Sequence, residues 1–176
     1  MSIGVGASGL ALGAGVILAS VLGVVLAAAL WWAYFDLFML VAERRLFAAK
    51  GEERARLARD AYPYLHLPMI SGIIFVALGI KQTLAHVGDP LGTIAAVALC
   101  GGVALYLLGH NAFRLREVGS ASVARVVVTV LCCALIPVAV SIPSLVTLAV
   151  LAGLMCALVA FETVRSRELR RELRAR

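Results

Sequence analysis

Charged residues are scarce in this sequence and unevenly placed. Asp, Glu, Lys and Arg make up 15% of the 176 residues, whereas they make up about a quarter of an ordinary soluble domain. Residues 1–35 and 126–161 contain none of the four. The chain is also 62% hydrophobic, with a mean hydropathy of +1.01. This composition excludes an ordinary water-soluble domain and predicts a membrane protein.

Signatures of known chemistry are also missing from the sequence. It contains no nucleotide-binding glycine loop, no catalytic serine elbow and no zinc-ligand pattern. The net charge of +6 is explained by membrane insertion and does not require a nucleic-acid partner. We therefore predict no cofactor and no metal. The four cysteines lack metal-type spacing, and we expect them to be small packing residues: Cys100, Cys132, Cys133 and Cys156.

Five long apolar stretches are present instead, and only helices suit segments of this length in a bilayer. Residues 126–161 as one helix would be about 54 Å long, far longer than a hydrocarbon core of about 30 Å. We therefore place a turn at "SIPS", residues 141–144. The prediction is an all-α, polytopic transmembrane bundle, residues 1–176 as a single domain, with a basic tail at 164–176. The expected spans are residues 10–34, 62–83, 91–113, 123–140 and 145–163.

The basic residues predict how the bundle is oriented. With these spans, 15 of the 16 Lys and Arg residues lie on one side, and only Lys81 lies on the other. Cytoplasmic loops of membrane proteins carry the excess of Lys and Arg. We expect the N-terminus outside and the C-terminus in the cytoplasm.

One carboxylate, Asp36, follows the first apolar stretch directly. Such a group is costly inside a bilayer and usually faces protein or a wet cavity. His66 and His110 return to the same cytoplasmic layer in the next two spans, which are antiparallel. We predict that these three side chains form one interior polar cluster, joined at similar depth by Tyr62, Tyr106, Asn111 and Glu162.

The role of this cluster has several interpretations. It could be a proton relay, a polar substrate site, a metal site or a set of contacts that holds helices in register. The last of these is favoured and a metal is not. A plainer interpretation is that the aromatic residues form an interfacial belt and that Glu162 pairs with Arg165 one turn later.

Three blocks of sequence carry a resemblance to a known family. They are "LWWAYFD" at 30–36, "YPYLHLPMISGIIFVALGIKQTLAHVGDP" at 62–90 and "GGVALYLLGHNAFRLR" at 101–116. Together they resemble the low temperature requirement A family of bacterial membrane proteins. The resemblance implies a multi-pass protein of the bacterial inner membrane, but no agreed reaction.

The resemblance covers only the C-terminal half of such proteins. Family members are about twice as long, and "IGVGASG" at 3–9 resembles the junction between their halves. The resemblance therefore implies that earlier helices are missing from this chain. Besides membrane lipids, we expect a second copy of the chain or a separate partner that supplies those helices.

Three functions remain open from the sequence. We favour a structural or accessory membrane component with no established reaction, which leaves enzymatic activity undecided. The alternatives are a proton-coupled transporter and an intramembrane enzyme that acts on a lipid or isoprenoid. In both alternatives Asp36, His66 and His110 would carry the chemistry.

Overall fold

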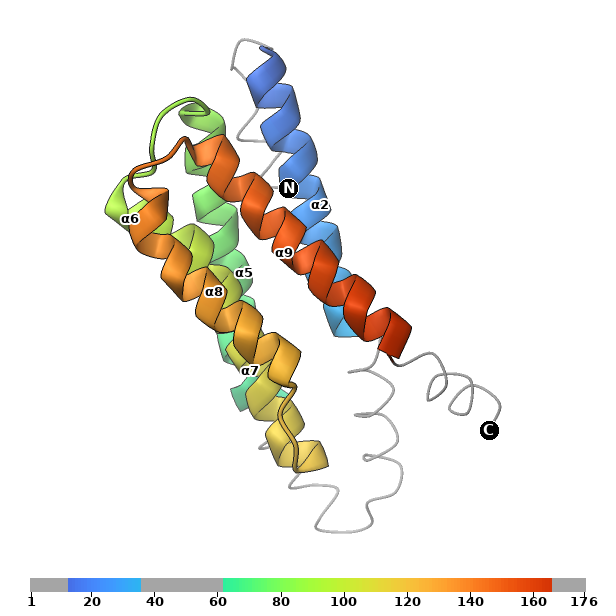
Figure 1. Ribbon diagram of the computed structural model, residues 1–176. Helices are drawn as coiled ribbons and strands as arrows, with labels where there is room; N and C mark the ends of the chain where they lie inside the picture. The colour runs from blue at the N-terminus through green and yellow to red at the C-terminus, as the bar shows by residue number, and fades with distance from the viewer. Residues whose placement is uncertain (1–12, 36–61, 166–176) are drawn as a thin grey trace.

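The computed structural model describes residues 13–35 and 62–165, and over these residues the regular elements are helices (Figure 1). The all-α prediction is confirmed. Six α-helices and one turn of π-helix make up the described part of the chain: α2 (Ala14–Phe35), α5 (Tyr62–Ala85), α6 (Thr93–Ala96), η2 (Val97–Gly101), α7 (Gly102–Val118), α8 (Val123–Ala139) and α9 (Ser144–Arg165).

Four of these helical segments are long and apolar enough to cross a membrane: Ala14–Phe35, His66–Ala85, Thr93–Arg116 and Ser144–Arg165. The segment Thr93–Arg116 consists of α6, η2 and most of α7. The fourth expected span, α8, has 17 residues and is therefore about 25 Å long, near the lower limit for crossing a bilayer. The third span continues to Val118, five residues beyond its expected end.

Glycines hold α5 and α7 in close contact. A Cβ on Gly72 would lie 2.6 Å from the carbonyl oxygen of Gly102, and a Cβ on Gly102 would lie 2.8 Å from that of Gly72. Gly79 and Gly109 lie one heptad further along their own helices, where a Cβ would approach Leu99 or Met69 to 2.5–2.7 Å. Since residues seven apart share a helix face, these glycines form one seam of backbone contact, as small residues commonly do in membranes.

The remaining helices complete the bundle. Helix α2 packs chiefly on α9, and α8 packs on both α7 and α9. Side chains from all the long helices fill the space between them, among them Leu26, Leu107, Val128, Leu151 and Met155. The contact between α2 and α5 is much less extensive, which leaves room for the cavity described below.

Two turns meet at one end of the bundle, one between α5 and α6 and the other the turn expected at residues 141–144. The amide of Ser144 donates to the carbonyl of Asp89 over 2.9 Å, and that of Leu91 donates to Ala139 over 3.3 Å. The hydroxyl of Ser144 donates to the carbonyl of His86 over 2.6 Å. These bonds satisfy backbone groups that a helix end leaves without intrahelical partners.

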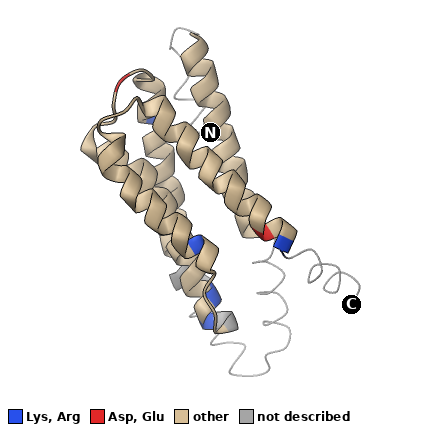
Figure 2. Cartoon of the chain, in the orientation of Figure 1, with Lys and Arg blue, Asp and Glu red and all other residues tan. Residues whose placement is uncertain are grey.

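The outer surface of the described bundle is apolar, and the charged residues that the structure describes lie near its ends (Figure 2). Large side chains such as Ile17, Val24, Ile74 and Val130 are about half exposed or more. An apolar surface of this extent would cause association in water but suits contact with lipid chains. Among the described basic residues, Lys81 lies near the end of α5 that leads to the two turns, and the arginines lie toward the opposite end.

Candidate functional site

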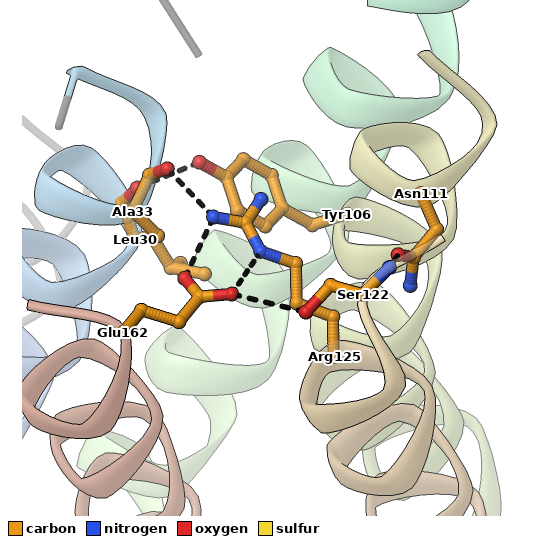
Figure 3. Close-up of polar contacts among 7 residues, drawn as sticks. All are labelled: Leu30, Ala33, Tyr106, Asn111, Ser122, Arg125 and Glu162. Carbon is orange, nitrogen blue, oxygen red and sulfur yellow. Dashed lines mark hydrogen bonds and ion pairs between the residues drawn. The ribbon is translucent and has the colours of Figure 1, made fainter. Parts of the chain in front are cut away.

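The most strongly bonded polar group in the described bundle is an ion pair between α8 and α9 (Figure 3). Arg125 donates from Nε to Oε1 of Glu162 and from Nη2 to Oε2, each over 2.8 Å. The two side chains are only 9% and 15% exposed. A bidentate pair of this geometry is stronger and more directional than a single contact between point charges.

The guanidinium also binds the backbone of a third helix. Arg125 Nη2 donates to the carbonyl of Ala33 in α2 over 3.2 Å. One turn earlier, the hydroxyl of Tyr106 in α7 donates to the carbonyl of Leu30 over 2.6 Å. Figure 3 shows both donors pointing toward this stretch of α2. The last turns of α2 are thus fixed by side chains from two neighbouring helices.

The start of α8 is joined to the same network. Ser122 donates its backbone amide to Asn111 Oδ1 over 3.0 Å and its hydroxyl to Glu162 Oε1 over 3.3 Å. The hydroxyl of Thr129 donates to the carbonyl of Arg125 over 2.8 Å. The carboxylate of Glu162 therefore accepts bonds from three donors, which offsets the cost of removing it from water.

A second polar cluster lies beside the first and is built from aromatic and imidazole rings. Tyr34 Oη and His66 Nε2 share a hydrogen bond of 2.8 Å. The Tyr34 ring also meets His110 edge to face at a centroid distance of 5.9 Å. The ring centroids of Tyr106 and His110 are 4.5 Å apart. His110 is fully buried. The cluster joins α2, α5 and α7.

The predicted site residues thus fall into two groups. His66, His110 and Tyr106 lie with Tyr34 in the ring cluster. Asn111 and Glu162 belong instead to the Arg125 network. Glu162 does not pair with Arg165 as the plainer interpretation supposed; Arg165 lies 6.0 Å over the ring of Phe161. Asp36 and the side chain of Tyr62 lie outside the described residues.

Sequence reasoning missed Arg125 and Tyr34. Arg125 was counted with the loop cations that set the orientation, but it lies in the first turn of α8 and is 7% exposed. The available signal was a charged residue inside a predicted span, since Arg125 is the third residue of the span expected at 123–140. Tyr34 gave a weaker signal, because it lies among aromatic residues typical of an interfacial belt.

A cavity of about 340 Å³ opens between α2 and α5 next to the ring cluster. Tyr34, His66 and Tyr106 are at one part of its wall, and the remaining lining side chains are aliphatic or aromatic apart from the thioether of Met69. In the described ranges 13–35 and 62–165 no three His, Cys, Asp or Glu side chains gather so as to hold a metal ion. The chemistry available is hydrogen bonding by a phenol and an imidazole at the edge of an apolar cavity.

The helical spans, the apolar surface and the buried polar contacts define a multi-pass membrane protein. Residues 1–160 match the family of the bacterial low temperature requirement A protein, and the chain belongs to that family. An uncharacterized protein of Rhizobium meliloti (strain 1021) is 37% identical over 84 residues, which cover 46% of this chain and 19% of the relative. The chain thus matches about a fifth of that relative's length. No solved structure matches the chain significantly.

Proposed function

We propose that the chain acts as a structural or accessory component of the bacterial inner membrane. The observation that carries this proposal is the Arg125–Glu162 pair, whose hydrogen bonds join helices of the bundle to one another. Both charges bond to α2, α8 or α9, and the neighbouring cavity is lined almost wholly by hydrocarbon. A carrier of protons or ions instead needs a polar, wet path that reaches its charged groups.

A paired substitution separates structure from transport. The double variant Arg125→Met, Glu162→Leu removes both charges and keeps side chains of similar length. If the pair only holds helices together, the double variant retains function, since hydrophobic replacements of buried pairs are often neutral. The readout is growth at low temperature of a deletion strain that carries each variant, a phenotype taken from the family's name. The amount of folded protein in the membrane is measured in parallel.

Failure of growth despite a normal amount of folded double variant would contradict the structural role. The transport alternative then predicts proton flux into proteoliposomes with the unaltered chain and none with the double variant. Arg165→Met is the matched control, because Arg165 lies at the same end of α9 but is exposed.

The same proposal places the N-terminus outside and the C-terminus in the cytoplasm. It is supported by the separation of Lys81 from the described arginines (Figure 2). Ser141 and Ser120 are both exposed and lie in connections on either side of α8. A membrane-impermeant maleimide should label Ser141→Cys in intact spheroplasts, and Ser120→Cys only after lysis. The reverse pattern would invert the topology.

A second candidate is an enzyme that acts on a lipid or isoprenoid. The observation that favours it is the position of His66 and Tyr34 at the wall of the apolar cavity. It predicts that the purified chain converts a component of extracted membrane lipids, detected by mass spectrometry, and that His66→Gln stops the conversion. An unchanged lipid profile with the unaltered chain would count against it.

Assembly is also part of the proposal. We expect the bundle to associate with a second copy or with a partner that supplies further helices. Native mass spectrometry of the chain purified from its own membrane tests this. A monomer with no bound protein would contradict the association.

A further inference from the structure

The cavity between α2 and α5 is shaped for a long, narrow apolar ligand. Its volume of about 340 Å³ lies near the lower end of the range for small-molecule sites, about 300–1,000 Å³. Its wall extends along α5 from His66 to Ile80. Fourteen residues of helix correspond to about 21 Å, longer than one leaflet of a hydrocarbon core of about 30 Å.

The cavity has a closed floor and an apolar rim. Its floor contains Leu30, Val76 and Tyr106, each less than 5% exposed, whereas Trp31 and Ile73 at the rim are 55% and 47% exposed. In a bilayer this rim faces lipid, so a ligand would enter sideways from the hydrocarbon. The cavity lies between α2 and α5 because these helices pack on different partners. Helix α5 packs closely on α7 through the glycine seam, and α2 packs mainly on α9.

One end of the cavity is polar without being basic. Tyr34 and His66 share their hydrogen bond there, and Phe35 packs on Tyr34 with a centroid distance of 4.9 Å. No Lys or Arg is among the described residues that line the cavity. Recognition of a lipid phosphate normally uses such cations. The aromatic rings and the phenol–imidazole pair suit a flat, neutral head group that accepts hydrogen bonds.

We propose that this cavity binds a neutral lipid with one long hydrocarbon chain and a carbonyl-bearing ring, the chemistry of an isoprenoid quinone. The head group lies at Tyr34 and His66. There a ring carbonyl of the ligand accepts a hydrogen bond from one of these side chains, in place of the bond that the two residues make to each other. The chain follows α5 toward Ile80. This proposal does not need the ion pair that carries the structural role, but it deepens the second candidate above, since both use the cavity beside Tyr34 and His66; the binding test below requires no conversion of the lipid.

The sequence provides a matched pair of positions for the test. Ala27 and Ala28 are adjacent and both exposed on α2, but only Ala27 lines the cavity. Ala27→Phe should fill the cavity, and Ala28→Phe should add the same ring on the lipid-facing surface. Circular dichroism melts of both variants verify that the bundle is intact.

The probe is menaquinone-4, added to the chain in nanodiscs, and the signal is quenching of Trp31 and Trp32 emission. We expect a saturable phase of about one quinone per chain. Ala27→Phe should weaken its apparent Kd by about tenfold or more, and Ala28→Phe should leave it unchanged. Tyr34→Phe and His66→Gln should each weaken it by about three- to tenfold, the range that corresponds to one hydrogen bond.

Three results would overturn the proposal. Quenching that rises linearly without saturation would mean that the quinone only partitions into the bilayer. Saturation that is equal in Ala27→Phe and Ala28→Phe would place binding elsewhere. The third result is saturable quenching by dibromostearic acid, weakened in Ala27→Phe, together with no saturable quenching by menaquinone-4. The occupant would then be a fatty acyl chain.

Discussion

Removing one member of the Arg125–Glu162 pair should destabilise the bundle far more than removing both. In Glu162→Leu the guanidinium keeps its bond to the Ala33 carbonyl but loses both contacts to the carboxylate. An uncompensated buried charge costs about 3–5 kcal/mol. Because the side chains are 9% and 15% exposed, we expect the lower end, about 3 kcal/mol.

The double variant Arg125→Met, Glu162→Leu should lie within about 1 kcal/mol of the unaltered chain, since no charge is left unpaired. The assay is equilibrium unfolding in mixed micelles by increasing SDS fraction, followed by helical circular dichroism. Arg165→Met is the control. Its side chain is exposed, so its effect should stay within about 0.5 kcal/mol.

Two outcomes of the double-mutant cycle would refute the reasoning. If Glu162→Leu costs no more than Arg165→Met, the pair does not hold α8 to α9. If the effects of Arg125→Met and Glu162→Leu simply add in the double variant, their coupling energy is zero. In that case the bidentate contact makes no net contribution to the folded bundle.

Two other predictions concern the remaining helix contacts. Gly102→Ala should lower stability by about 2 kcal/mol or more, because its Cβ would lie 2.8 Å from backbone atoms of α5; Gly101→Ala should be nearly neutral, because its Cβ would meet only a Val97 methyl at 3.7 Å. Ser144→Ala should cost about 1 kcal/mol, because it removes the hydroxyl that bonds to the His86 carbonyl. The same SDS titration measures both, and equal effects of the two glycine variants would contradict the close seam.

The spans could be predicted from the sequence because their cause is local. An apolar stretch about 20 residues long must satisfy its own backbone in lipid, and a helix does so without other parts of the chain. The ends were less predictable. Helix α7 continues to Val118 because polar residues near a membrane surface, such as Arg114 and Arg116, favour a helix as much as a loop.

The pairing of the polar residues could not be read from the sequence. The partner of Glu162 is 37 positions away in Arg125, whereas Arg165 was a nearer candidate on the same helix. The glycine seam of α5 and α7 was also missed, although Gly72 and Gly79 have heptad spacing. Which small residues meet depends on how helices are placed around one another, and hydropathy carries no information about that.

Tyr106 tests how α2 is held beside the cavity. Its hydroxyl donates a hydrogen bond from α7 to the Leu30 carbonyl of α2. Its ring also forms part of the cavity floor. Tyr106→Phe keeps the ring and removes the bond. Because the Leu30 carbonyl also lies inside a helix and has an intrahelical donor, we expect a loss of about 1 kcal/mol rather than the full cost of a buried orphan.

The change should be local as well as small. Hydrogen exchange of the α2 amides after Leu30 should quicken in Tyr106→Phe, whereas exchange in α9 should not change. Tyr34→Phe is the comparison, because it removes the link from α2 to His66 and leaves the Tyr106 bond in place. If only Tyr34→Phe quickens exchange in α2, the helix is held by α5 across the cavity. In that case the Tyr34–His66 bond would hold α2 to α5 more strongly than the sparse packing between these two helices indicates.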